Sequence, residues 1–228
     1  MKKVIFLVFG ILITAGSFFL SSHISDHRIT ESFYQAETKE PAEQIKKVAL
    51  TFDDGPNEEY TPKLLDGLKK RNVRATFFLL GKQVEQYPEL AKRISDEGHL
   101  IGCHAYEHKD LSRLSLEEAC RQITDTNDLL YEVTGHRPMF MRPPYGSCQE
   151  QLPEKTEMIE VLWDIDTVDW SLRNTDQVVK NTLKKVEDGS IILMHDEFQE
   201  SVDAALQLVD ALEKEGYQLV TVEELILD

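Results

Sequence analysis

Short apolar runs alternate with longer amphipathic stretches from Lys46 to the end of the chain. The runs resemble strands of a buried parallel sheet, and seven of them predict strands. These predicted strands cover residues 48–53, 75–80, 100–104, 139–142, 159–164, 190–194 and 218–221. Between them, apolar residues recur at helical spacing, and five helices are predicted over residues 61–70, 84–97, 115–131, 175–186 and 201–215.

Strand–helix alternation over most of the chain is typical of an α/β fold with parallel strands. Seven strands are too few for a regular eightfold barrel. We therefore expect a distorted or incomplete (β/α) barrel, with a doubly wound open sheet as the alternative. The helix at 115–131 has a clear start signal, because Ser115-x-x-Glu118 matches a capping box, and it stops near Gly135.

The N-terminus has a different pattern. Met1-Lys2-Lys3 precedes an uncharged apolar run, residues 4–20, which predicts an export signal just long enough to span a membrane. No small-x-small cleavage site follows it, so we expect a retained signal-anchor over residues 1–22, with a cleaved signal peptide as the alternative. The lysines before the run place the rest of the chain outside the cytoplasm. Residues 23–45 are polar and predict a linker, and residues 46–228 form the globular domain.

Composition narrows the choice of partner. The formal net charge of −16 disfavours nucleic acid and anionic lipid, which both favour Lys and Arg patches. We expect a monomer. Three cysteines, Cys103, Cys120 and Cys148, show no CxxC spacing and predict small buried side chains, although a Cys103–Cys148 bridge stays open.

Polar residues follow the apolar runs where the predicted strands end. They are Asp53, Asp54, His104, Arg142, Asp166, Asp169 and His195. Ligands of parallel α/β folds bind at the carboxyl ends of the strands. We therefore expect these side chains to share one site.

Two adjacent acids, Asp53 and Asp54, precede Gly55-Pro56, and such a pair repels unless a cation lies between them. Both can serve one site only if the strand distorts there. His104 and His108 are four residues apart, which on a helical turn brings both rings to one face. With Asp54 they would form a two-His, one-carboxylate site with open positions, as in catalytic metal centres. Zn²⁺ is the default ion, other divalent ions suit the same ligands, and spacing alone does not say which acid binds it.

Five segments in order resemble the motifs of the polysaccharide deacetylase family, the NodB-like carbohydrate esterases. The segments are Thr51-Phe52-Asp53-Asp54-Gly55-Pro56, His104-x3-His108, Arg142-Pro143-Pro144-Tyr145-Gly146, Asp166-x2-Asp169-Trp170 and Leu193-Met194-His195. The resemblance spans about residues 46–225. It implies a distorted (β/α) barrel and metal-dependent removal of acetyl groups from N-acetylated glycans. Ala105 departs from the usual Ser or Thr, and we expect a changed loop hydrogen bond there and no loss of activity.

The resemblance also implies roles for the acids and their partners. Asp53 would be the general base, and Asp54, His104 and His108 the metal ligands. Arg142 would orient Asp53, as a charged planar fork can.

For the remaining residues, the resemblance implies that His195 is the general acid, with either Asp166 or Asp169 tuning it. The backbone N–H of Tyr145 would help to bind the oxyanion, and Leu193 would line the acetyl pocket. Two tryptophans are read differently, Trp170 as a groove wall and Trp163 as core. The acids that follow His195, Asp196 and Glu197, are expected to be solvated or to cap the loop.

The sequence thus predicts a metal-dependent N-deacetylase acting outside the membrane. Peptidoglycan is the first expected substrate, a chitooligosaccharide or biofilm glycan the second, and an esterified polysaccharide the third. The alternatives are a glycan-binding pseudoenzyme and a metal-independent glycosidase with paired carboxylates. The glycosidase has no use for the His-x3-His pair.

Overall fold

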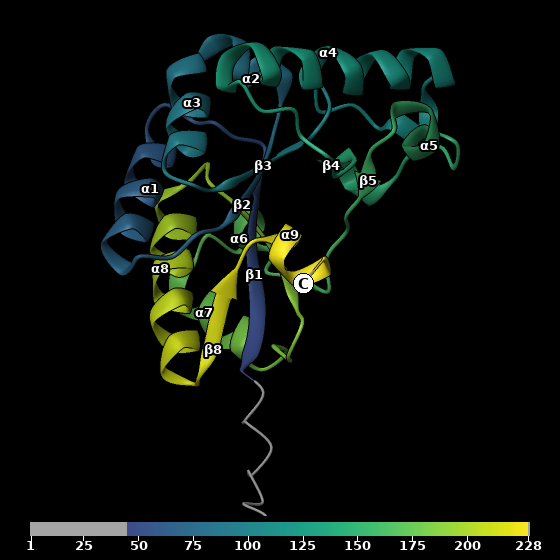
Figure 1. Cartoon of the computed structure of the whole chain (residues 1–228). Helices are drawn as coiled ribbons and strands as arrows, with labels where there is room; N and C mark the ends of the chain where they lie inside the picture. Colours follow the sequence, from purple (N-terminus) through teal and green to yellow (C-terminus); the bar gives the residue numbers. More distant parts are fainter. Residues whose placement is uncertain (1–44, 228) are drawn as a thin grey trace, which may run out of the picture. The chain divides into compact units, whose positions relative to one another are not determined.

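The computed structural model describes residues 45–227 (Figure 1). The predicted signal-anchor and nearly all of the predicted linker lie outside these residues. Within 45–227, no helix is long and apolar enough to cross a membrane.

Eight parallel strands form one sheet in the order β5-β4-β3-β2-β1-β7-β6, with β8 paired to the first half of β1 (Figure 1). The strands are β1 (Lys46–Asp53), β2 (Thr76–Leu79), β3 (Leu100–Cys103), β4 (Phe140–Met141), β5 (Ile159–Glu160), β6 (Ile165–Asp166), β7 (Ile191–His195) and β8 (Tyr217–Val220). β5 and β6 follow one another in the chain but lie at opposite edges of the sheet. The barrel is therefore incomplete, as predicted.

Most helices pack on the outer face of the sheet. The helices are α1 (Tyr60–Arg71), α2 (Gly81–Gln86), α3 (Pro88–Asp96), α4 (Leu116–Thr134), α5 (Leu152–Thr156), α6 (Asp169–Leu172), α7 (Thr175–Leu183), α8 (Gln199–Lys214) and α9 (Val222–Ile226), with 3₁₀ turns at η1 (Leu111–Arg113) and η2 (Pro144–Gly146). α9 instead packs on the other face of the sheet through Val222, which contacts the cluster of Ala49, Phe78 and Phe140. α8 packs between α1 and α7, and α3 packs against α4. Ser115 Oγ accepts the Glu118 N–H at the start of α4, and Gly135 ends that helix in a left-handed conformation.

Strand β1 is buried on both faces, as a central parallel strand must be. Val48, Leu50 and Phe52 belong to the large core beneath the helices. Ala49 belongs to a separate cluster with Phe78 and Phe140. Because side chains alternate along a strand, Asp53 continues the row of Ala49.

The predicted strand at 159–164 is wrong in its second half. Ile159 pairs with β4, but Ile165 pairs with β7 on the opposite edge, and the residues between them cross from one edge to the other. Arg142 fixes this crossing, because its Nε donates to the Val161 carbonyl (3.1 Å) and its Nη2 to the Leu162 carbonyl (3.0 Å). One predicted strand thus becomes two, which gives eight strands where seven were expected.

The predicted helix at 84–97 is also two elements. α2 begins earlier, at Gly81, and α3 begins at Pro88. Tyr87 between them has φ −132° and ψ 59°. Proline disfavours helical geometry in the residue before it and suits the first helical position, so the chain stops and restarts at this point.

Candidate active site

The end of β1 distorts so that both acids face one site. Asp53 closes the strand and is 3 % exposed, and Asp54 adopts a left-handed backbone with φ 75°. On a regular strand the two side chains would point to opposite faces. The positive φ turns Asp54 toward the loop that follows β3.

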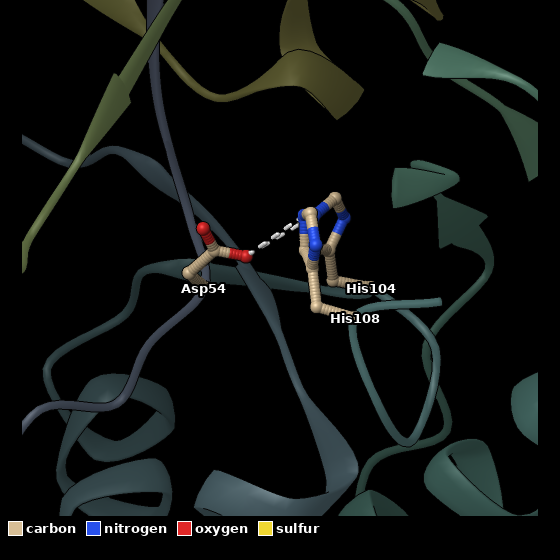
Figure 2. Close-up of side chains that lie close together, drawn as sticks. All are labelled: Asp54, His104 and His108. Carbon is tan, nitrogen blue, oxygen red and sulfur yellow. Dashed lines mark ion pairs between the residues drawn. The ribbon is translucent and has the colours of Figure 1, made fainter. Parts of the chain in front are cut away.

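Asp54 meets two histidines from that loop (Figure 2). Its Oδ1 lies 3.4 Å from His104 Nε2 and 3.5 Å from His108 Nε2, and the three ligand atoms lie within 4.8 Å of one another. This Oδ1 is buried and accepts no hydrogen bond from the described residues. A buried carboxylate oxygen without a donor, facing two imidazole nitrogens, fits a divalent cation.

The orientation of His104 fits that of a metal ligand. Its Nδ1 lies 2.6 Å from the Arg142 carbonyl oxygen. A carbonyl only accepts, so Nδ1 carries the proton and the Nε2 lone pair faces Asp54. Burial lowers the pKa of His104, which favours the neutral ring that a metal requires.

The predicted helical turn between the two histidines is wrong. Residues 104–108 form an irregular loop, with Ala105 fully buried at φ 68°. Its carbonyl accepts the Gly81 N–H at the start of α2 (3.0 Å), and the Tyr106 carbonyl accepts the Lys82 N–H (3.0 Å). The left-handed residue and these two bonds bring the rings of His104 and His108 to 5.4 Å between centroids.

Arg142 is fully buried and contacts the other acid. Its Nη1 donates to Asp53 Oδ1 (2.8 Å) and to Thr51 Oγ1 (2.7 Å), and its guanidinium lies 4.1 Å from the ring centre of Phe78. The Thr51 hydroxyl donates its own proton to the Ile192 carbonyl, so its oxygen can accept a hydrogen bond from Arg142. The Asp53 carboxylate is thereby held in one orientation.

His195 and Asp169 form a second pair. Asp169 accepts from His195 twice, at ring Nδ1 (3.0 Å) and at the backbone N–H (3.0 Å). Burial alone would lower the pKa of His195. The hydrogen bond and charge of Asp169, with the charges of Asp53 and Asp54, outweigh it and raise the pKa to about 9. His195 Nε2 remains free and lies 3.9 Å from Asp54 Oδ2.

Asp166 lies apart from this pair. Its Oδ1 accepts the Val168 N–H (2.8 Å), which supports a left-handed turn at Val168 (φ 56°). β-Branched residues rarely adopt this conformation. The turn starts α6 and brings Asp169 beneath His195, so the two acids have different positions.

A cavity of about 460 Å³ unites these residues, a volume usual for small-molecule sites. It is lined by Asp53, Asp54, His104, His108, Tyr145, Trp163, Asp166, Trp170, Leu193, His195 and Glu197. Tyr145, at φ 61° and 67 % exposed, packs its ring edge-on at 4.6 Å from that of His108. Leu193 is buried at the base and Trp170 is half-exposed at the rim.

A larger hollow of about 1010 Å³ lies at the amino ends of the strands. Four of its charged side chains are in ion pairs: Lys69 with Glu97, Arg74 with Glu224, and Asp96 with Lys92. None of the predicted site residues lines it. The cavity at the carboxyl ends is therefore the candidate site.

Comparison with known families identifies the family of this fold. The sequence profile of the family described as polysaccharide deacetylase matches residues 40–161. The chain belongs to the polysaccharide deacetylase family.

Curated polysaccharide deacetylases and a solved structure share this domain. The chain is 43% identical over 194 residues to the peptidoglycan-N-acetylmuramic acid deacetylase PdaC of Bacillus subtilis, covering 85% of this chain and 41% of that protein. It is 45% identical over 182 residues to a peptidoglycan-N-acetylglucosamine deacetylase of Bacillus cereus, covering 77% and 66%. The structure of PdaC superposes with a TM-score of 0.77 at 44% identity, covering 80% of this chain and 90% of that one. The chain thus spans about two fifths of the length of PdaC.

Asp196 and Glu197 are expected to be solvated or to cap the loop, and the structure contradicts a solvated Asp196. Asp196 is fully buried and accepts a hydrogen bond from Thr61, and burial raises its pKa to about 7 while that bond opposes the rise. Glu197 lines the cavity, where burial and then the charge of Asp54 raise its pKa. Trp163, expected in the core, also lines the cavity. Only their adjacency to His195 and to the 166–170 segment could have signalled these positions.

The three cysteines are free, so the bridge between Cys103 and Cys148 is not formed. Cys103 is buried as expected, and burial raises the pKa of its thiol to about 12. Cys120 and Cys148 are partly exposed at the edge of the same apolar cluster. The thiol of Cys103 is protonated at neutral pH and therefore unreactive.

Proposed function

We propose that this chain is a metal-dependent hydrolase that removes N-acetyl groups from N-acetylhexosamine residues of peptidoglycan. One observation carries the proposal: a base candidate and an acid candidate, each held by its own buried partner, border the same three-ligand group. Asp53 is held by Arg142, and His195 is held by Asp169. Amide hydrolysis needs this separation of proton acceptor and proton donor.

Asp54, His104 and His108 would hold the divalent ion, with Zn²⁺ as the default. When bound, such an ion lowers the pKa of water and polarises a carbonyl oxygen. Asp53 accepts a proton from the water as the water oxygen attacks the acetyl carbonyl carbon. His195 then donates its Nε2 proton to the sugar nitrogen as the carbon–nitrogen bond breaks, releasing acetate and a free amine.

The cavity walls supply the binding contacts. The backbone N–H of Tyr145 would stabilise the oxyanion, and buried Leu193 would pack on the acetyl methyl group. Trp170, half-exposed at the rim, offers an apolar face to a sugar ring, and Trp163 adds a second wall.

The two curated relatives support peptidoglycan as the substrate, since one is a peptidoglycan-N-acetylmuramic acid deacetylase and the other a peptidoglycan-N-acetylglucosamine deacetylase. A chitooligosaccharide or a biofilm glycan is the alternative. The basic start and the apolar run at 4–20 support export, with residues 1–22 as an anchor, 23–45 as a linker and 46–228 as the catalytic domain.

Acetate release from a panel of glycans tests the proposal. The purified chain should release acetate from peptidoglycan only with a divalent metal. Asp53→Asn keeps the shape of the side chain and the metal ligands, so it should retain stoichiometric metal while turnover falls by about 10²–10⁴-fold. Asp128→Asn, on the surface of α4, is the matched control and should retain activity.

Two results would count against the proposal. An active Asp53→Asn variant would remove Asp53 as the base. Stoichiometric metal without acetate release from any glycan would favour a glycan-binding pseudoenzyme on the same fold.

A further inference from the structure

Asp196 is a fully buried acid directly behind the proposed active site. It follows His195 at the end of β7, and it sits against the turn that follows β1. One carboxylate oxygen, Oδ2, accepts the Thr61 hydroxyl, and Oδ1 has no hydrogen-bond donor among the described residues. Burying a carboxyl group this way costs free energy, so a functional reason for its position is worth seeking.

Thr61 links Asp196 to the turn after β1. The Thr61 Oγ1 accepts the Asn57 N–H (2.7 Å), so its own proton points to Asp196. The Asn57 side chain in turn accepts the N–H groups of Glu59 (2.9 Å) and Tyr60 (3.0 Å) at the start of α1. The hydrogen-bonded chain runs from the end of β7 through the whole β1–α1 turn.

Asp196 also contacts the residue that follows Asp54. A Cβ added to Gly55 would lie 2.8 and 2.9 Å from the two Asp196 carboxylate oxygens. The carboxyl group therefore packs on the Gly55 backbone without room for any side chain. Asp54, the residue before Gly55, has a left-handed backbone. This conformation costs energy in a residue other than glycine and persists only where the surroundings fix it.

We propose that Asp196 is a positioning residue for the metal site. Through Thr61 and its contact with Gly55, it holds the turn after β1 so that Asp54 faces His104 and His108. This inference rests on the proposed function, because it assumes that these three residues bind the ion.

Binding of Co²⁺, followed by its visible absorbance and by calorimetry on the full chain, tests the inference without relying on activity. Asp196→Ala and Thr61→Val should weaken binding about 10- to 100-fold, the range seen when groups supporting metal ligands are removed. Asp196→Asn still offers an oxygen to the Thr61 hydroxyl and should restore most of the affinity. Thr182→Val, at a fully buried threonine of α7 far from these contacts in sequence, is the matched control and should bind Co²⁺ like the wild type.

Gly55 supplies a second, reciprocal test. Gly55→Ala places a methyl group against the Asp196 carboxylate and should also weaken Co²⁺ binding. In the double variant Gly55→Ala/Asp196→Ala, the clash is removed, so the combined loss should be smaller than the sum of the two single losses. Fully additive losses would mean that Asp196 does not act through Gly55 and would overturn that contact's role.

Wild-type affinity in folded Asp196→Ala and Thr61→Val variants would overturn the inference while leaving the proposed function intact. If Asp196→Ala does not fold, Thr61→Val decides, because it removes only the hydroxyl. A wild-type chain that binds no Co²⁺ would contradict the proposed function itself and this inference with it.

Discussion

Both carboxylate oxygens of Asp169 accept hydrogen bonds from the same residue, His195. Asp169 accepts from the His195 ring and from the His195 backbone. The imidazole is thus fixed in rotation and in protonation, with Nδ1–H toward Asp169 and Nε2 toward the cavity. A residue so held is suited to deliver a proton in one direction.

The pH dependence should report this pair. A general acid works while protonated, so the proposed role of His195 predicts that turnover falls as pH rises through its pKa, which is raised to about 9. Asp169→Asn removes the charge that raises it, so the alkaline limb of the kcat profile should move to lower pH. In Asp166→Asn the alkaline limb should stay in place even if kcat falls, because Asp166 contacts Val168 and not the ring.

The same pair affects stability with a definite sign. The folded pKa of His195 lies above its ordinary value of about 6.5, so the pairing stabilises the fold at pH below about 6.5. That contribution is lost as pH rises through about 9.

For the kcat profile, an unchanged alkaline limb in Asp169→Asn would contradict the assignment of His195 as the acid.

The residue types, their places at strand ends, the Asp53–Arg142 pair and the group of Asp54, His104 and His108 were predictable, but the partner of His195 was not. Asp166 and Asp169 are three apart at the end of one strand, and only the left-handed Val168 between them decides which one reaches His195. The Asp166 side chain supports that conformation by accepting the Val168 N–H. Spacing carries no trace of it.

Left-handed residues end several of the helices. Gly135 closes α4 at φ 76°, and Glu157 closes α5 at φ 55°. Glycine adopts this conformation freely, whereas a residue with a Cβ pays about 1–2 kcal/mol. The two caps therefore allow a reciprocal test, in which glycine is removed from one cap and introduced at the other.

We expect Gly135→Ala to lower the free energy of unfolding by about 1 kcal/mol, solely through the backbone, since a Cβ there would meet nothing within 4 Å. The exposed Glu157→Gly should raise it, by somewhat less than about 1 kcal/mol, because glycine also gains freedom in the unfolded chain. Urea unfolding of both variants measures the two changes in the free energy of unfolding. Effects of the same sign would contradict the backbone explanation.

The start of α4 at Ser115 and its stop at Gly135 were predictable because they depend on neighbours in the sequence. The division of residues 159–164 was not, because the guanidinium of Arg142, from another strand, takes the carbonyls that a strand would use. The loop of residues 104–108 was misjudged for a similar reason. Its shape depends on donors from α2 as well as on its own sequence.

The proposed metal ligands come from distant parts of the domain. Asp54 follows β1, whereas His104 and His108 follow β3. An ion bound there ties two segments that the unfolded chain leaves apart. Stability should therefore depend on metal concentration.

We expect the melting temperature to fall when a chelator removes the metal. At a free metal concentration of about 100 Kd, binding should add about 2.7 kcal/mol to the free energy of unfolding. His108→Ala should abolish the metal-dependent shift, and His136→Ala, at an exposed histidine after α4, should keep it. A shift that persists in His108→Ala would place the ion elsewhere.

Arg142 follows β4 and joins its end to two other parts of the barrel, since it donates to Asp53 and Thr51 on β1 and to the Val161 and Leu162 carbonyls of the crossing. Arg142→Lys offers a single ammonium that cannot serve donors in these separate directions. We expect a loss of about 3–5 kcal/mol in the free energy of unfolding, measured in urea. Arg137→Lys, in an exposed pair, should change it by less than about 0.5 kcal/mol. A loss below about 1 kcal/mol for Arg142→Lys would contradict this view of the crossing.

The position of Arg142 also affects how related sequences should be judged. Because it spans the gap between β5 and β6, a descendant that no longer hydrolysed anything would still need it to fold. Finding this arginine in a sequence is therefore poor evidence of an active enzyme. The histidines are better indicators, because His108 borders solvent and supports no strand, so selection for folding alone would not preserve it.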